Sequence, residues 1–91
     1  MRESDIQKKV VQYARSKGIL AYKFNSDGHR AVPDYLFIGN NKMWFIEFKA
    51  TGKVATALQL EEHKKIRSRG TSVYVIDDIL EGVKIIDWFN A

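Results

Sequence analysis

Three ionisable side chains stand in a stretch that is otherwise strongly apolar: Asp34, Glu47 and Lys49. Asp34 begins one apolar run. Glu47 and Lys49 lie two residues apart in the next run, so in a strand their side chains leave the same face of a sheet. Burying a carboxylate and an ammonium group is costly unless they pair or bind a cation. Two interpretations follow: a divalent-cation site with an adjacent lysine, or a structural Glu47–Lys49 ion pair with Asp34 capping a strand.

The stretch from Pro33 to Ala50 predicts a β-hairpin that carries these side chains. Its first strand contains Leu36, Phe37 and Ile38, and the next four residues, Gly-Asn-Asn-Lys at 39–42, are rich in turn formers. A second apolar run follows over residues 43–50. This hairpin is the element around which the other segments are expected to be arranged.

The order of these residues resembles the PD-(D/E)xK nuclease superfamily, in which a Pro-Asp and a hydrophobic strand precede a Glu-x-Lys. Within the superfamily, the short chain, Val-Pro-Asp-Tyr-Leu at 32–36, Ile-Glu-Phe-Lys-Ala at 46–50 and the downstream Gln59 most resemble the VRR-NUC domain. The similarity extends from Glu3 to about Ile76. Each motif is short, but the ordered set in its turn and helix context is specific.

The resemblance implies a metal-dependent active site. Its catalytic residues would be Asp34, Glu47, Lys49 and Gln59, and Asp34, Glu47 and the backbone carbonyl of Phe48 would hold Mg²⁺ or Mn²⁺. Such an ion neutralises charge in phosphodiester hydrolysis, activates a water and needs few protein ligands because it keeps several waters. Lys49 would orient that water or stabilise the charge of the transition state.

An amphipathic helix is expected to begin at a capping box formed by Ser4 and Gln7 and to end at Gly18. Its apolar stripe consists of Ile6, Val10, Tyr13 and Ala14. Glu3 lies just outside the cap, where a negative charge favours a helix N-terminus. The resemblance instead implies that an acidic residue here reaches the metal site. Both roles stay open for Glu3.

A half-buried strand is predicted over residues 19–25, where large apolar side chains occupy every second position. A turn closes it, and the irregular segment 29–33 is of the kind that carries binding side chains. His29 and Arg30 there, and Lys53 in a crossing after the hairpin, are the candidate DNA-binding residues. Asp27 and His29 are more simply a turn aspartate and a surface histidine than metal ligands, because no second histidine stands at ligand spacing.

The second half of the chain predicts a helix, a strand and a helix. Thr56 is the expected N-cap of a helix over 57–69 with a thin apolar stripe (Leu58, Leu60 and Ile66). The β-branched run 71–76 indicates a buried parallel strand, and 78–89 keeps helical spacing, with a strand over 83–86 as the alternative. The fold class is therefore α/β, with a mixed sheet of about four strands in the order α-β-β-β-α-β-α, the restriction-endonuclease-like architecture that the resemblance also implies.

The 91 residues make one domain, 1–91, and a formal charge of +4 suits a polyanionic partner. Solvated helix faces are the plain alternative for the basic clusters. The sequence has no cysteine, which excludes disulfides and a thiolate zinc site. The apolar runs are too short to span a bilayer, and no signal core begins the chain. We therefore expect a cytoplasmic protein of a bacterial or phage-infected cell, with no membrane partner.

These features predict an Mg²⁺- or Mn²⁺-dependent DNA endonuclease. The alternative is a basic DNA-binding or assembly module with the same fold and no turnover. Asp34, Glu47 and Lys49 together favour the enzyme, because a module without chemistry has no reason to keep acids that repel phosphate. The absence of a glycine-rich phosphate loop, a nucleophile elbow or a zinc signature argues against a nucleotide cofactor or a small-molecule enzyme.

The expected working unit is a homodimer that cuts branched DNA, such as four-way (Holliday) junctions. Two cuts related by a two-fold axis match the symmetry of an isologous dimer. The resemblance to small stand-alone family members implies the same assembly. Ile85, Trp88 and Phe89 are candidate interface residues, with ordinary core packing as the alternative.

Overall fold

The computed structural model describes residues 1–91, which form seven elements. In chain order these are α1 (Glu3–Ser16), β1 (Leu20–Lys23), β2 (Tyr35–Gly39), β3 (Lys42–Phe48), α2 (Ala57–Ser68), β4 (Ser72–Ile76) and α3 (Ile79–Phe89). This order confirms the predicted α-β-β-β-α-β-α arrangement. The last segment is a helix and not a strand over 83–86. None of the helices is long and apolar enough to span a membrane.

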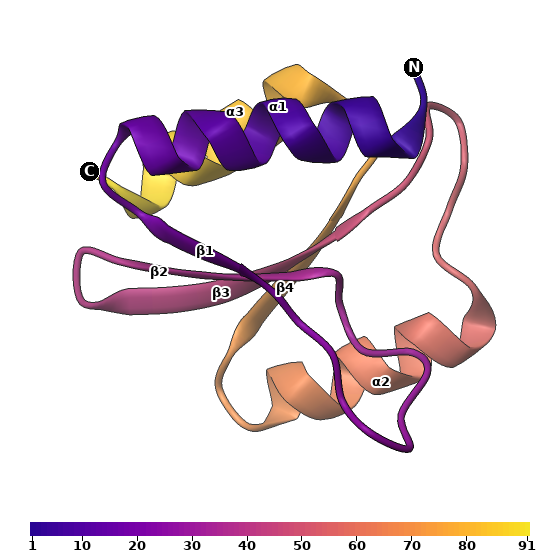
Figure 1. Cartoon of the computed structure of the whole chain (residues 1–91). Coiled ribbons are helices and arrows are strands. Elements are labelled where there is room, and N and C mark those ends of the chain that lie inside the picture. Colours follow the sequence, from indigo (N-terminus) through magenta and orange to yellow (C-terminus); the bar gives the residue numbers. More distant parts are fainter.

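The four strands form one mixed sheet in the spatial order β1-β2-β3-β4. β1 pairs with β2 and β2 with β3 in antiparallel fashion, and β4 lies parallel to β3 at the far edge. Asn40 and Asn41 join β2 to β3 with φ angles of 54° and 60°, values that favour asparagine in a two-residue hairpin turn. Figure 1 shows α1 and α3 together on one face of the sheet and α2 on the other.

The α1–α3 face holds the main core. Trp44 on β3 stacks on Phe37 of β2 and on Phe89 of α3, with ring centroids 5.8 and 4.1 Å apart. Gly82 lets α3 pack closely here, because an added Cβ would lie 2.5 Å from a methyl group of Val10 and 2.6 Å from Ile76. Phe89 is thus a core residue, which is the core-packing alternative left open for it.

The α2 face is more polar than expected. The predicted stripe is wrong, because Leu58 and Leu60 are exposed and the one buried residue of α2 is His63. The side chain of Arg67 donates hydrogen bonds to the backbone carbonyl of Val73 on β4. The helix therefore rests on the sheet through polar contacts around His63.

The ends of two elements differ from prediction. α1 begins at Glu3 after an N-cap at Arg2 that makes no side-chain bond, so the capping box at Ser4 is wrong. The backbone before α1 is fixed instead by Met1, whose amine donates to Thr51 Oγ1 and whose carbonyl accepts from the Thr51 N–H. A capping box does form in α2, between the predicted N-cap Thr56 and Gln59.

The edge strands are less buried than their sequences suggested. In β1 the small Ala21 faces the core and the larger Leu20 and Tyr22 are exposed. β4 was expected to be covered on both faces. It is an edge strand with Val73 buried on the α2 face and Ile76 buried on the α1–α3 face, and its other residues are partly exposed. The well-covered strand is β3, which carries Glu47.

Candidate active site

Asp34 and Glu47 are brought together by the antiparallel pairing of β2 and β3. Asp34 immediately precedes β2 and Glu47 is the penultimate residue of β3. The Asp34 carboxylate accepts a hydrogen bond of 2.8 Å from the Phe48 N–H, so it is fixed to the end of the neighbouring strand. The two carboxylates predicted from the sequence therefore lie at the same end of the β2–β3 pair.

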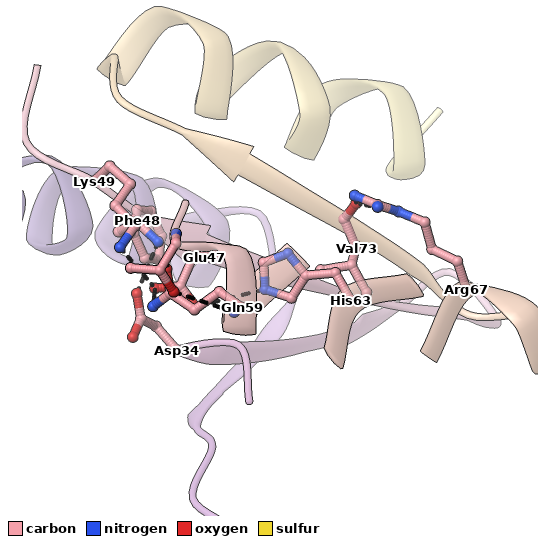
Figure 2. Close-up of polar contacts among 9 residues, drawn as sticks. Asp34, Glu47, Phe48, Lys49, Gln59, His63, Arg67 and Val73 are labelled. Carbon is pink, nitrogen blue, oxygen red and sulfur yellow. Dashed lines mark hydrogen bonds and ion pairs between the residues drawn. The ribbon is translucent and has the colours of Figure 1, made fainter. Parts of the chain in front are cut away.

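Glu47 lies at the centre of the site, where its side chain meets groups from α2 and from the segment after β3 (Figure 2). Gln59 Nε2 of α2 donates to its Oε2 over 3.2 Å, and Lys49 Nζ lies 4.0 Å from the same oxygen. The other oxygen, Oε1, is buried without a hydrogen-bond partner and lies 3.8 Å from His63 Nε2. Glu47 is only 3% exposed, so these groups make up its polar surroundings.

The electrostatics of the site disfavour a negative charge on Glu47. Burial first, and then the neighbouring Asp34, raise the pKa of Glu47 to about 8, and Lys49 opposes this shift. Two adjacent carboxyl groups in a buried site resist simultaneous ionisation. A cation placed between them would remove that penalty, and perturbed carboxyl groups of this kind are typical of functional sites.

The residues present fit a hard divalent cation. No group of three or more His, Cys, Asp or Glu side chains gathers as a metal site. Asp34 and Glu47 nevertheless offer two carboxylates, and Glu47 Oε1 has no protein partner. Mg²⁺ commonly takes one or two carboxylates and completes its shell with water. Glu3 is exposed in the first turn of α1, and its charge adds slightly to the raised pKa of Glu47, so its role as a ligand stays a prediction.

α2 supplies two of the side chains around Glu47. Gln59 was predicted, and its own side-chain oxygen accepts from the Thr56 N–H, which helps to fix the amide that reaches Glu47. His63 was not predicted, and in the sequence it stands beside the basic residues Lys64 and Lys65. Its position four residues after Gln59 was the available signal, because that spacing puts both side chains on one helix face. Burial, and then Arg67, lower the pKa of His63, which favours the neutral imidazole.

The comparisons with known proteins agree with this geometry. No family model matches the chain. The phage protein named "Putative nuclease p44", from Acyrthosiphon pisum secondary endosymbiont phage 1, is 44% identical over 78 residues, which cover 85% of this chain and 84% of that protein. A solved structure titled VRR_NUC domain matches with a TM-score of 0.84 and 29% identity, over 93% of this chain and 94% of that one. The chain belongs to the VRR-NUC family. The resemblance and the fold class expected from the sequence are thus confirmed.

The candidate DNA-binding residues of this VRR-NUC domain line two different hollows. His29 and Arg30 are exposed and line an open hollow of about 770 Å³ that also reaches Asp34. Lys53 lies in the crossing after β3 and lines a different hollow of about 450 Å³. Asp27 lines the first hollow but makes no contact with Glu47. DNA binding by His29, Arg30 and Lys53 stays a prediction.

Proposed function

We propose that this VRR-NUC domain is a metal-dependent DNA endonuclease with Asp34, Glu47, Lys49 and Gln59 in its active site. The observation that carries the proposal is the buried Glu47, which is held beside a second carboxylate and a lysine and keeps one oxygen without a partner. The name of the phage relative and the family assignment support the same class of reaction. A module that only binds DNA has no evident use for this electrostatic penalty.

The cation is Mg²⁺ or Mn²⁺, held by Asp34 and Glu47. The carbonyl of Phe48 and the carboxylate of Glu3 are further candidate ligands from the resemblance. When bound, such an ion supplies positive charge against the phosphoryl oxygens and makes a coordinated water more acidic. The protein fixes its own ligands in advance: the Phe48 N–H holds Asp34, and Gln59 holds Oε2 of Glu47.

Lys49 supplies the positive group beside the carboxylates. Its Nζ lies 4.0 Å from Glu47 Oε2, which is longer than a charge-assisted hydrogen bond of about 2.7–2.9 Å. Its N–H donors therefore stay available for a water or a phosphate oxygen. Through them Lys49 orients the attacking water or stabilises the negative charge that develops in the transition state.

The substrate is DNA, and the basic residues around the site provide phosphate contacts. Arg30 and His29 share the hollow that reaches Asp34, and Lys53 follows Lys49 by four residues. A strand bound at the carboxylate pair would meet Arg30 and His29 in the hollow that they share with Asp34. Contacts of this kind position the backbone and are independent of base sequence.

The working unit is a homodimer that cuts branched DNA, with four-way junctions as the preferred substrate. An apolar area of the sheet supports self-association. Leu20, Tyr22 and Met43 on β1 and β3 are 51%, 53% and 48% exposed, and the partly buried Ile38 pairs with Leu20 and Met43 across the strands. We call this area the open sheet face; it is uncovered because α2 packs mainly on β4, at the other edge of the sheet. A second copy packed here by two-fold symmetry would bring two active sites to one junction.

One set of assays tests these claims. Purified protein is incubated with junction, flapped, linear and single-stranded DNA in Mg²⁺ or Mn²⁺ and then in EDTA, and its mass is measured by light scattering. We expect cation-dependent cutting, a preference for junctions and the mass of a dimer. Cleavage that persists in EDTA would refute the metal, and a monomer that cuts linear duplex equally well would refute the assembly and substrate. No cleavage of any substrate would favour the binding module.

A further inference from the structure

His63 is a buried polar residue that the proposed chemistry does not use. It is 0% exposed, and neither ring nitrogen has a hydrogen-bond partner. Oε1 of Glu47 is also buried without a hydrogen-bond partner, and His63 Nε2 lies 3.8 Å from it. Two buried groups that both lack a partner thus face each other at slightly more than hydrogen-bond length (Figure 2).

We propose that His63 is a positioning residue that holds Glu47 by a hydrogen bond from its Nε2–H to Oε1. Gln59 already donates to Oε2 from one helical turn earlier. One face of α2 would then fix both carboxylate oxygens, each from a different side chain. The positioning itself follows from the geometry alone, and only its consequence for cleavage rests on the proposed function.

Packing alone does not account for a histidine at this position. A buried polar group without a partner costs about 1–3 kcal/mol, and an apolar side chain of similar volume would avoid that cost. The ring is the one buried side chain of α2 and stands where the helix meets the sheet. A neutral imidazole carries a single N–H. Of the two ring nitrogens, Nε2 is the one that lies near a carboxyl oxygen, Oε1 of Glu47, so the Nε2–H tautomer gives that N–H an acceptor.

The hydrogen bond would leave Glu47 free to bind a cation. Each carboxylate oxygen has two lone-pair positions, so an oxygen that accepts from α2 keeps a second position for a cation. Removing a group that hydrogen-bonds to a metal ligand and orients it typically lowers metal affinity by about 10–100-fold. The effect of His63 should therefore be visible in cation binding without any DNA.

A matched pair of substitutions separates positioning from packing. His63→Met fills the space without a donor, and His63→Gln restores an N–H donor on a chain of similar length. We expect His63→Met to weaken Mn²⁺ binding, measured by calorimetry on the DNA-free protein, by about 10–100-fold, and His63→Gln to recover most of the loss. Ile66→Ala, a packing change on the same helix, should leave Mn²⁺ affinity near that of the wild type. Equal affinities for wild type and His63→Met would overturn the proposal.

A second measurement needs no substitution at position 63. Nitrogen-15 NMR of the histidine rings reports which nitrogen carries the proton, and His29→Asn assigns the only other histidine. We expect the Nε2–H tautomer for His63 in the metal-free wild type above about pH 8, where Glu47 is ionised and can only accept a hydrogen bond. An Nδ1–H tautomer would refute the hydrogen bond even if His63→Met failed to fold. If the tautomer and the Mn²⁺ data agree but no DNA is cut, the positioning stands and the proposed function fails.

Discussion

The two faces of the sheet are built from the same strands but have opposite character. On β3, Trp44, Ile46 and Phe48 point to α1 and α3 and are buried in an apolar core. The intervening Phe45 and Glu47 point to the α2 side, where Glu47 meets Gln59 and His63. The period of two in a strand thus separates a packing surface from a polar site within seven residues.

The two faces also differ in how favourable their buried contacts are for the stability of the fold. The α1–α3 face packs tightly enough that Gly82 has no room for a side chain. The α2 face keeps a carboxyl group of raised pKa and two unpartnered ring nitrogens. The packed face has one such group, the indole N–H of Trp44, so unpartnered polar atoms are concentrated on the α2 face but not confined to it. Functional sites commonly break local rules in this way. We therefore expect substitutions on the two faces to separate activity from stability.

The largest effects should come from the α2 face. Asp34→Ala, Glu47→Ala and Lys49→Ala should each lower the cleavage rate by about a thousandfold or more, because each removes a metal ligand or a charge-stabilising group. DNA binding should largely survive, as measured by fluorescence anisotropy.

The matched controls for these three lie on α3, across the sheet. Asp87→Asn and Lys84→Ala remove an exposed carboxylate and an exposed lysine and should leave the cleavage rate close to that of the wild type. Near wild-type cleavage by any one of the three site variants would show that its assigned role is wrong. If all three kept that rate, the nuclease proposal would fail.

On the α1–α3 face the main effect should be on stability. Phe89→Ala removes a ring that stacks on Trp44 at 4.1 Å and should lower the free energy of unfolding by about 3–5 kcal/mol. The neighbouring Trp88 is 67% exposed, so Trp88→Ala should cost less than about 1 kcal/mol. Urea denaturation compares the two. Similar losses for both variants would mean that the stability of the α1–α3 face does not depend on the stacking of Phe89 on Trp44.

A third comparison concerns pH in the absence of metal. Because the pKa of Glu47 is raised to about 8 from 4.5, its ionisation is disfavoured in the folded state. Its stabilising effect is complete below about pH 4.5 and is lost as the pH rises through about 8. The melting temperature in EDTA should therefore fall across this range.

Glu47→Gln cannot ionise and should flatten the decline, so that at pH 8 and above it is the more stable protein. Asp87→Asn, on the other face, should keep the wild-type slope. Adding Mn²⁺ should raise the melting temperature of the wild type more than that of Glu47→Gln. A wild-type slope that Glu47→Gln leaves unchanged would assign the pH dependence to other groups.

The same contrast explains which features could be predicted from the sequence. The hairpin was predictable because Asn40 and Asn41 favour the left-handed conformation that its turn requires. Asp34 and Glu47 were found because charged residues in an apolar stretch demand a partner. These signals are local, and each lies within a few residues of the feature that it predicts.

The features that were missed depend on contacts between distant segments. Phe89 and Trp88 are adjacent and similar in the sequence, and only the position of Trp44 decides which one is buried. α1 starts before its expected cap because Met1 bonds to Thr51 from across the fold. His63 resembled its basic neighbours because a helix with a weak apolar stripe does not reveal which face packs on the sheet.

The smallest predicted effects concern the exposed basic residues beside the site. Each phosphate contact releases counterions, so the logarithm of DNA affinity falls linearly with the logarithm of salt concentration. Arg30→Ala and Lys53→Ala should each reduce that slope by about one unit and weaken binding to different DNA sequences about equally. Lys84→Ala on α3 changes the net charge by the same amount on the other side of the sheet, so it should leave the slope nearly unchanged.

If all three variants gave the same small change, net charge alone would account for the effect, and Arg30 and Lys53 would be ordinary solvated surface residues. A loss confined to Arg30 and Lys53 would locate the DNA on the polar face, across the carboxylates of Asp34 and Glu47.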